Sequence, residues 1–365
     1  MKSDCYALFD LAQWKNGLAF KKIDFSSDGE PVIKIAELKN GITGQTQFTE
    51  GDYGDEVHLT KGDMLFSWSG NPETSIDVFW YNLPDGWLNQ HIFKVIPKPF
   101  VDRNFLYYLL KSLKATFTAI ASNKQTTGLG HITLKDLKKL NIALPSEKEQ
   151  KIIGRYLYTI DQKISVNQAI NDNLEQQAQA IYVNMFIDNI DSEWQQGHLS
   201  DLITVRYGKD HKKLANGSYP VFGSGGLMRR VERPLYDKES VLIPRKGTLN
   251  NVMYVNEPFW SVDTMFYSEM RLPNVAKFVY HFVKSQDLSS MNTGSAVPSM
   301  TTDILNSMEI VIPSADALAR FENTISPLYM MMQENEKQNL TLIKLRDILL
   351  PKLMSGELDV SELDI

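Results

Sequence analysis

A heptad pattern of apolar positions runs through the middle of the chain. From residue 153 to residue 185 the steps between these positions alternate between four and three, which places their side chains on one seam of a coiled coil. Ser146 and Glu149, just before this run, have the spacing of a capping box. The pattern predicts a helix from about residue 146 to residue 186. The first seam reads Ile153, Leu157, Ile160, Ile164, Asn167, Asn171 and Leu174.

The same pattern returns at a constant offset of 168 residues. Leu144-Pro145-Ser146 opens the first run, and Ile312-Pro313-Ser314 opens the second. Proline lacks a backbone donor and clashes with the preceding helical turn, so Pro327 predicts a break followed by a second helix to about Leu350, before Pro351. The second seam reads Phe321, Ile325, Leu328, Met332, Asn335, Asn339 and Leu342.

We expect the two helices to pair antiparallel about a pseudo-twofold axis, with the blocks that precede them at opposite ends. This pairing brings Asn167 near Asn339 and Asn171 near Asn335, where polar contacts fix the register at some cost in stability. The alternative is that these asparagines are simply solvated. Apolar residues beside the seams widen both helix faces, so further helices, from another subunit, can dock there. These residues are Val166, Ile170, Met330 and Met331.

Each helix follows a globular block with mixed strand and helix signals, and the blocks also resemble each other. Pro31-Val32-Ile33 matches Pro220-Val221-Phe222, and the segment 87–93 matches 260–266. We therefore expect an α+β protein of two pseudo-symmetric mixed α/β domains separated by an antiparallel coiled coil of two long α-helices. The expected domains are residues 1–143, the helix 144–186, residues 187–311, the helical region 312–355 with its break near Pro327, and an acidic tail, 356–365.

Composition allows a folded protein of two or three domains but does not identify its partner. The chain has 365 residues, 43% of them hydrophobic, and a net charge of −6. Residues 1–143 carry 16 basic and 16 acidic side chains, and residues 187–311 carry 13 and 14. Residues 312–365 carry 5 and 9, so most of the excess negative charge lies in this last segment. Basic patches on the two blocks are compatible with these counts.

Location and cofactors are limited by what the sequence lacks. No apolar run is long enough to span a membrane, and the first residues lack the features of a secretory signal, so we expect a cytoplasmic protein that binds no membrane. Cys5 is the single cysteine, and the six histidines show no ligand spacing. We therefore expect no metal site and no cofactor in this chain.

Basic and polar residues gather in loops after equivalent strands of the two blocks. Arginine or lysine beside glycine can contact phosphates or guanine edges, and asparagine or glutamine can pair with adenine. The alternatives are solvated surface and ordinary polar turns. Arg245 and Lys246 are the leading candidates for contacts with DNA. The full set is Lys15, Asn16, Lys21, Lys22, Ser67, Trp68, Asn71, Lys124, Gln125 and Thr126 in the first block, and Arg206, Tyr207, Lys209, His211, Lys212, Lys213, Arg229, Arg230, Arg245, Lys246, Thr248, Asn292 and Ser295 in the second.

Signatures of catalysis are missing from the sequence. There is no phosphate-binding GxxxxGK[ST] loop, no DPPY or NPPF methyltransferase box and no convincing acidic cluster. Glu147 and Glu149 belong to the capping turn of the first helix, which explains their position without a metal. We expect no catalytic residues here and place the chemistry on another chain.

Over nearly its whole length the chain resembles the specificity subunits of type I restriction-modification systems. The resemblance rests on the doubled LPS or IPS helix opening, the heptads after it, the lead-in TTGLGHITLKDLKKLNIALPS and the terminal LRDILLPKLMSGEL. Arg346 departs from the repeat, because Ala178 holds the matching seam position.

The resemblance implies two target-recognition domains, each reading one half of a split site in double-stranded DNA. It implies that the helix pair sets the spacer between the half-sites and docks two methyltransferase subunits, which restriction and translocation subunits then join. S-adenosylmethionine, ATP and Mg would belong to these partners. The alternative function is a coiled-coil scaffold or adaptor whose two globular domains bind protein and read no DNA. A self-contained methyltransferase is disfavoured by the missing motifs.

Overall fold

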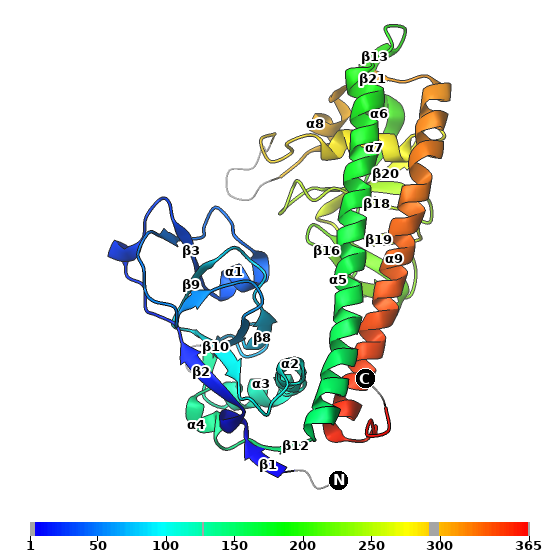
Figure 1. The fold of residues 1–365 in the computed structure, drawn as a ribbon. Helices are drawn as coiled ribbons and strands as arrows, with labels where there is room; N and C mark the ends of the chain where they lie inside the picture. Colours follow the sequence, from blue (N-terminus) through cyan, green and yellow to red (C-terminus); the bar gives the residue numbers. More distant parts are fainter. Residues whose placement is uncertain (1–3, 126–127, 292–298, 364–365) are drawn as a thin grey trace. The chain divides into compact units, whose positions relative to one another are not determined.

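The computed structural model describes residues 4–125, 128–291 and 299–363, and it divides into two units (Figure 1). Unit 1 comprises Met1–Val166 and Gln338–Ile365, and unit 2 comprises Asn167–Lys337. The helices α5 (Glu147–Val183) and α9 (Ala315–Ser355) each contribute one part to unit 1 and the other part to unit 2. Each unit therefore contains one globular block and a portion of both long helices.

The block of unit 1 contains two four-stranded sheets. The first is antiparallel, in the order β2 (Ala12–Asn16), β10 (Ile92–Pro97), β6 (Met64–Ser67), β8 (Asp77–Trp80). The second has the order β4 (Phe48–Thr49), β3 (Glu30–Ile33), β9 (Gly86–Leu88), β5 (His58–Leu59), with β3 and β9 parallel. Two antiparallel pairs join β1 (Asp4–Ala7) to β12 (Asn141–Leu144) and β7 (Ser69–Gly70) to β11 (Gly130–His131). The helices are η1 (Leu8–Leu11), η2 (Lys22–Asp24), α1 (Ile35–Asn40), α2 (Arg103–Ser112), α3 (Lys114–Ser122) and α4 (Leu134–Leu137).

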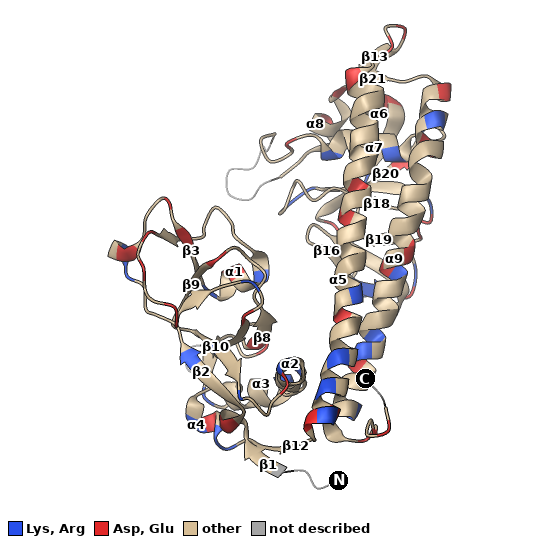
Figure 2. Cartoon of the chain, in the orientation of Figure 1, with Lys and Arg blue, Asp and Glu red and all other residues tan. Residues whose placement is uncertain are grey.

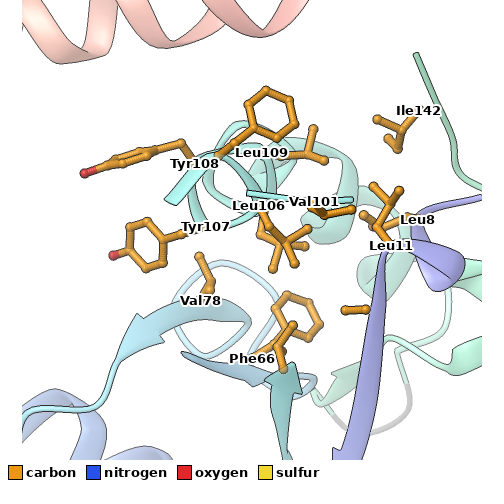
Figure 3. Close-up of a cluster of buried hydrophobic side chains, with 14 of the residues drawn as sticks. Leu8, Leu11, Phe66, Val78, Val101, Leu106, Tyr107, Tyr108, Leu109 and Ile142 are labelled. Carbon is orange, nitrogen blue, oxygen red and sulfur yellow. The ribbon is translucent and has the colours of Figure 1, made fainter. Parts of the chain in front are cut away.

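The core of unit 1 lies between its antiparallel sheet and α2 (Figure 3). Asp102 caps α2, since its carboxylate accepts a hydrogen bond from the amide of Phe105 at 2.9 Å. Every residue from Phe105 to Leu110 is buried, because the sheet covers one side of α2 and α5 covers another. Tyr108 shows the second contact, as its hydroxyl donates to Asp161 of α5 at 2.7 Å. The continuous apolar run is therefore that of a helix buried on both sides.

Unit 2 repeats this architecture. Its antiparallel sheet has the order β14 (Ile203–Tyr207), β20 (Met265–Met270), β17 (Ser240–Pro244), β18 (Met253–Val255). A second sheet has β16 (Gly226–Val231), β15 (Asn216–Gly223) and β19 (Trp260–Ser261), with β15 and β19 parallel. β13 (Gln195–His198) pairs with β21 (Glu309–Ile312). The shorter helices are α6 (Leu199–Leu202), α7 (Ala276–Lys284) and α8 (Thr302–Asn306), and a π-helical turn, η3 (Asn184–Asp188), follows α5.

The strand register repeats as well as the strand order. Phe93 of β10 pairs with Asn16 on one side and with Phe66 on the other. Phe266 of β20 pairs in the same way with Tyr207 and Ile243. The predicted duplication of a mixed α/β block is therefore confirmed, and the register makes Asn16 equivalent to Tyr207 and Lys15 to Arg206.

A close approach between two backbone segments explains why a glycine follows β2 and another follows β14. A Cβ on Gly17 would lie 2.2 Å from the carbonyl oxygen of Asn89, and one on Gly208 would lie 2.0 Å from that of Val262. Real Cβ atoms do not approach an oxygen so closely, so both positions require glycine. This close approach holds the loop after β2 against residues 88–89, and the loop after β14 against the equivalent residues 261–262.

The seams of the two long helices are buried as predicted. Ile153, Leu157, Ile164 and Leu174 on α5 are buried, as are Phe321 and Ile325 on α9. The remaining apolar seam residues, Ile160, Leu328, Met332 and Leu342, are partly buried. Burial that follows the alternating steps of four and three is what the heptad pattern required.

Two reciprocal hydrogen bonds show that the helices run antiparallel. Asn171 donates to the carbonyl oxygen of Met332 at 3.1 Å, and Asn339 donates to that of Ile164 at 3.5 Å. At the offset of 168 residues, Asn171 corresponds to Asn339 and Ile164 to Met332. The two bonds are therefore equivalent under a pseudo-twofold rotation. Asn335 also donates to Asn171 at 2.8 Å, which confirms that predicted pair and makes the solvated alternative wrong for these two residues. Asn167 and Asn339 are both buried, and their pairing stays a prediction.

The predicted break at Pro327 is wrong, because α9 is one helix from Ala315 to Ser355. Pro327 is exposed, whereas Ile325 before it is buried and Tyr329 after it packs on the core of unit 2. This burial offsets a proline cost of about 3 kcal/mol. Ser326 is no N-cap, since its hydroxyl donates to Glu322 at 2.6 Å.

Nor does Pro351 end the helix, as the sequence predicted. Leu349 and Leu350 before it and Leu353 after it pack on the core of unit 1, so the same compensation applies there. The helix ends instead before Gly356, whose φ of +73° suits a glycine.

Replacing Pro327 by alanine should stabilise unit 2 by about 1–3 kcal/mol, because alanine restores a backbone donor at an exposed helix position. Urea unfolding followed by circular dichroism measures the change. Pro351→Ala is the matched variant and should raise the stability of unit 1 instead. A less stable Pro327→Ala protein would contradict the prediction and would show that the packing of α9 requires the proline.

The C-terminal end of the chain completes the core of unit 1. Leu353 and Val360 are buried in the same cluster as Leu8 and Phe105. Lys148, near the start of α5, donates to the carbonyl oxygen of Ser361 at 3.2 Å. Residues 356–365 were expected to form a separate acidic tail, but up to Val360 they belong to the fold of unit 1.

Arg346 departs from the helix repeat for a local reason. Its guanidinium donates to the carboxylate of Asp161 at 2.8 Å, and Tyr108 donates to the same carboxylate. The larger side chain therefore joins α9 to α5 and, through Asp161, to α2.

Of the described helices, none is both long enough and apolar enough to cross a membrane.

Candidate nucleic-acid interface

Three loops of unit 2 meet at the segment 261–264. The amide of Lys209 donates to the carbonyl oxygen of Ser261 at 2.8 Å, and the amide of Arg245 donates to that of Thr264 at 2.9 Å. Val262 donates to the carbonyl oxygen of Phe222 at 3.1 Å. The loops after β14, β15 and β17 are therefore held together by backbone hydrogen bonds, and we call residues 209–213, 223–228 and 245–251 the converging loops.

The first two converging loops and the segment 262–264 border a cavity of about 570 Å³. Its lining includes Asp210, His211 and Lys212 from the first loop and the turn from Gly223 to Met228 from the second. Gly225 and Gly226 have open space where a side chain would be, so their backbone is accessible. Asn251 of the third loop donates to the carbonyl oxygen of Ser224 at 2.8 Å. Glycine backbone beside lysine is a suitable environment for a phosphate group.

Lysine ammonium groups provide the free positive charge of this site. Lys209, Lys212, Lys213 and Lys246 are exposed, and no carboxylate lies within ion-pair distance of their ammonium groups in the residues that the structure describes. Thr248, in the third converging loop, is exposed as well. These lysines can contact phosphates without first breaking an ion pair.

The arginines of unit 2 are more constrained. Arg229 donates to the ring nitrogen of His211 at 3.1 Å and to the carbonyl oxygen of Leu214 at 3.0 Å, so it holds the first converging loop in place. Arg230 donates to the carbonyl oxygen of Ser218 at 2.5 Å. These contacts assign Arg229 mainly to loop structure.

Arg206 forms an exposed ion pair with Glu269 at 3.0 Å. The hydrogen bond and charge of Glu269 raise the pKa of Arg206, so the arginine stays charged but is engaged by its own chain.

Arg245 is oriented toward the surface by two contacts. Its guanidinium donates to the carbonyl oxygen of Asp263 at 3.0 Å and lies 5.4 Å from the centre of the Tyr207 ring. Tyr207 is itself 53% exposed and packs edge-on against Phe266. An arginine stacked on a tyrosine keeps part of its planar donor set available while losing conformational freedom. Tyr207 and Arg245 were separate candidates in the sequence, and the structure brings them together.

Unit 1 has an aromatic and amide surface at the equivalent position. The indole of Trp68 donates to the side-chain oxygen of Asn16 at 3.1 Å, and its ring stacks on Phe93. The backbone amide of Trp68 donates to the carbonyl oxygen of His91, whose ring lies 5.6 Å from the indole. The structure therefore brings together two predicted residues, Asn16 and Trp68, with His91, which was not predicted.

Several lysines of unit 1 are engaged by carboxylates. Lys15 pairs with Glu56 at 2.5 Å, and Lys124 pairs with Asp136 at 2.5 Å. Burial opposes ionisation of Asp136, but the hydrogen bonds from Lys124 and Thr133 hold its pKa below the usual value. These pairs assign Lys15 and Lys124 a structural role that the sequence did not reveal.

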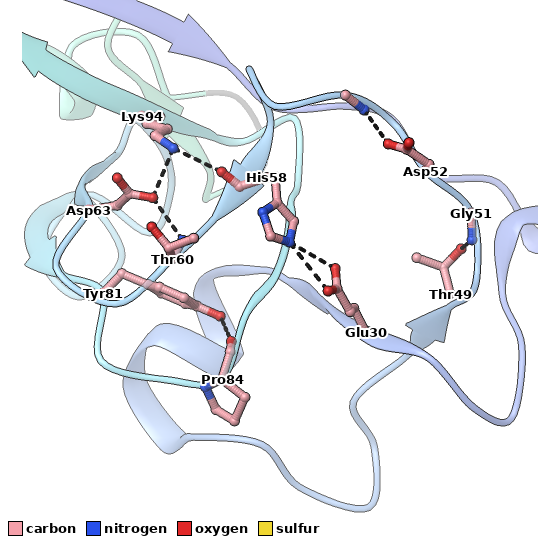
Figure 4. A network of polar contacts seen from close by, with 11 residues as sticks. Glu30, Thr49, Gly51, Asp52, His58, Thr60, Asp63, Tyr81, Pro84 and Lys94 are labelled. Atoms are coloured by element: carbon pink, nitrogen blue, oxygen red, sulfur yellow. Dashed lines mark hydrogen bonds and ion pairs between the residues drawn. The ribbon is translucent and has the colours of Figure 1, made fainter.

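The same pairing extends to other charged groups of the block. Lys94 contacts Asp63 at 2.9 Å, and His58 contacts Glu30 (Figure 4). Acidic residues are spread through the loops around β3 (Figure 2). Of the candidate lysines, Lys15 and Lys124 of the first block are held in ion pairs, whereas those of the second block form none among the described residues.

The remaining candidates of unit 1 have different surroundings. Lys21 and Lys22 are exposed at the start of η2. Asn71 is exposed, but its side chain accepts the amides of Glu73 and Thr74 in a local turn. Gln125 donates to the carbonyl oxygen of Gly128 at 2.8 Å.

Ser67 is fully buried, so its proposed contact with DNA is wrong. Its side chain points inward because β6 is buried on both faces. Three further candidates, Thr126, Asn292 and Ser295, lie outside the described residues.

The residues missed by the sequence come from one repeated segment and one turn. Residues 87–93 and 260–266 match between the blocks through their apolar positions, whereas their polar residues differ. Gln90, His91, Asp263 and Thr264 lie in these segments and contact the candidate loops. The turn that contains Ser224 has no basic or aromatic residue, so its sequence did not indicate a binding site. Among the described residues, no group of three histidine, cysteine or acidic side chains could hold a metal ion.

Comparison with known proteins identifies the family. Residues 2–176 and 191–343 match the model of the type I restriction modification DNA specificity domain. The type I restriction enzyme MjaIX specificity subunit of Methanocaldococcus jannaschii is 24% identical, over 94% of this chain and 96% of that protein. The EcoBI specificity subunit of Escherichia coli is 25% identical, over 68% of this chain and 46% of that protein.

A solved structure has the same fold. The S subunit of a type I restriction-modification system from M. genitalium superimposes with a TM-score of 0.60 at 17% identity, covering 96% of this chain and 95% of that one. The family model matches the chain twice, once over each of the two blocks and into the helix that follows it. The chain therefore belongs to the type I restriction-modification DNA specificity family.

Proposed function

We propose that the two blocks each read one half of a split DNA site and that the chain performs no chemistry itself. The observation that carries the proposal is the set of converging loops in unit 2, where Lys212 lines a cavity beside accessible glycine backbone and three more exposed lysines lie on the same loops. Unit 1 has Asn16 and Trp68 on the same strand framework. One framework with two different surfaces suits a protein that reads two different half-sites.

The long helices are proposed to set the spacer between the half-sites and to dock two methyltransferase subunits. Apolar side chains beside the seams are exposed and available for docking, namely Val166, Ile170, Met330 and Met331. Restriction and translocation subunits would complete the assembly. S-adenosylmethionine, ATP and Mg are assigned to these partner subunits, and the complex is expected in the cytoplasm. The scaffold alternative is not favoured by the family match.

Replacing Lys212 and Lys246 together by alanine should weaken DNA binding and reduce its dependence on salt. Each lost phosphate contact lowers the slope of log affinity against log salt by about 1. Fluorescence anisotropy with a labelled duplex, between about 50 and about 200 mM salt, measures this slope for the complex with methyltransferase. Lys238→Ala, an exposed lysine outside the converging loops, is the control. An unchanged slope in the double variant would remove the site from the interface.

Arg245→Ala should weaken binding through the second block alone, by about 1–3 kcal/mol if a base contact is lost. Arg245→Lys keeps the charge but loses the planar fork and should restore little of a base contact. Competition with duplexes altered in one half-site at a time locates the loss. If Arg245→Ala binds every duplex as the parent does, its contacts with Tyr207 and Asp263 are structural only.

A further inference from the structure

Unit 2 contains a second cavity, of about 670 Å³, that shares no residue with the candidate DNA contacts. It lies among β18, α7 and the portions of α5 and α9 that belong to this unit. Three tyrosines form part of its wall: Tyr254 from β18, Tyr280 from α7 and Tyr329 from α9. Five glutamates also line it, so the cavity combines aromatic rings with an excess of negative charge.

The chain's own Lys277 shows which chemistry this wall accepts. Its ammonium lies 5.3 Å from the centre of the Tyr254 ring and 5.5 Å from that of Tyr329. It also contacts Glu322 at 2.5 Å and Glu239 at 3.4 Å, while its side chain is only 6% exposed. A buried ammonium between carboxylates and ring faces is a stable cation site. This part of the cavity is therefore already filled by an internal cation.

Two carboxylates elsewhere on the lining have no such cation. Glu257 and Glu336 both line the cavity, and within the described residues neither forms an ion pair. Both side chains remain exposed to solvent, while partial desolvation in the cavity, together with the charges of Glu257 and Glu175, raises the pKa of Glu336. Like charges held together are unfavourable, and a positive group between them would relieve the repulsion.

Methionines supply an apolar surface beside these carboxylates. Met253, Met330 and Met332 line the cavity, and Met330 is 69% exposed. Methionine side chains are flexible and adapt to apolar groups of different shape. An exposed apolar residue next to unpaired acidic residues fits a ligand that carries both an apolar and a basic group.

Unit 1 has no acidic residues at the positions that match this lining. The acidic lining is therefore not part of the framework that the two units share. At the helix offset of 168 residues, Glu322 corresponds to Gly154 and Glu336 to Gln168, while Glu175 corresponds to Ile343. Glu239 corresponds to Gly62 by the register of β17 and β6. The duplicated fold therefore forms without these carboxylates. Lys277 pairs with Glu322 and Glu239, and Lys284 pairs with Glu175, so Glu336 and Glu257 are the two that need another explanation.

We propose that this cavity receives a basic, apolar-anchored segment of a partner protein. A lysine or arginine side chain enters between Glu257 and Glu336, and apolar side chains of the same segment pack on Met330 and Met332. The charge and the apolar surface of the cavity complement such a segment, whereas a small polycation would use only the carboxylates. The proposal does not depend on DNA reading, and Met330 is the one residue that it shares with the surface proposed for methyltransferase docking.

The test measures binding of a labelled amphipathic helical peptide of leucine and lysine to the full chain. Fluorescence anisotropy should show binding at least about tenfold weaker for the double variant Glu257→Gln, Glu336→Gln, since a lost charge contact of about 1.4 kcal/mol has that effect. Glu334→Gln is the matched control, because Glu334 is exposed on α9 and does not line the cavity. Met330→Ser should also weaken binding, and a peptide with glutamine in place of lysine should bind poorly.

Three results would overturn the proposal. The first is equal affinity of the parent and the double variant, and the second is equal affinity for the lysine and glutamine peptides. The third is full displacement of the peptide by spermidine together with unchanged binding in Met330→Ser, which would assign the cavity to a small polycation. Urea unfolding of each variant shows whether a loss of binding reflects a loss of folding. Because Glu257 and Glu336 are replaced by isosteric amides, we expect no loss of stability.

Discussion

A chain that ends at Asp347 should lose the stable fold of unit 1 while unit 2 still unfolds cooperatively. The deletion removes Leu353 and Val360 from the buried core, and Leu349, Leu350 and Met354 from its edge. Loss of one buried leucine side chain typically costs about 2–5 kcal/mol. Two buried residues and three partly buried ones therefore represent much of a domain stability of about 5–15 kcal/mol.

Hydrogen exchange followed by mass spectrometry distinguishes the two units in this experiment. Peptides from α2 and β6 should lose protection in the shortened chain, and peptides from α7 and β17 should keep it. Leu353→Ala should lower the stability of unit 1 by about 2–5 kcal/mol, whereas Leu358→Ala, at a half-exposed position in the same segment, should change it little. Full protection of α2 after the deletion would show that the C-terminal segment is dispensable.

Seven residues inserted into both long helices should lengthen the recognised spacer and leave both half-sites unchanged. Insertions after Ala169 and after Lys337 lie at equivalent positions of the repeat and preserve the seam. The bonds of Asn171 with Met332 and of Asn339 with Ile164 fall on opposite sides of the insertions, so both are kept. Seven helical residues add about 10 Å, which is about three base pairs of DNA at about 34 Å per turn.

Genome-wide mapping of adenine methylation reads the half-sites and the spacer together. The same insertion in α5 alone is the control, because it moves one seam by a heptad against the other and should abolish recognition. Altered half-sites in the double insertion would mean that the helices also influence base reading. An unchanged spacer would mean that the distance between half-sites is set elsewhere.

The periodic parts of the fold were predicted well because their physical cause is local. The heptad seam and the Ser146 capping box follow from spacing along one helix, and the pairing of Asn171 with Asn335 follows from the antiparallel register of two matching seams. Pro327 was misjudged because its cost is also local, while the burial of Ile325 and Tyr329 that offsets it depends on tertiary contacts.

The candidate site was predicted less completely because exposure and pairing depend on distant residues. Lys124 looked like a free cation until the fold placed Asp136 beside it. Serine is a residue type common in loops, yet Ser67 lies in a strand that is covered on both faces. Arg245 and Tyr207 are 38 positions apart in sequence, and only the pairing of both β14 and β17 with β20 brings them together.

The reciprocal asparagine bonds also bear on how this protein could change its specificity. Because each bond is the mate of the other, these two contacts are isologous, as in a symmetric dimer. Two separate polypeptides, 1–190 and 191–365, should therefore reassemble, with the peptide link contributing chiefly effective concentration. In that view, the link between the repeats matters less for folding than for keeping two particular half-specificities in one molecule.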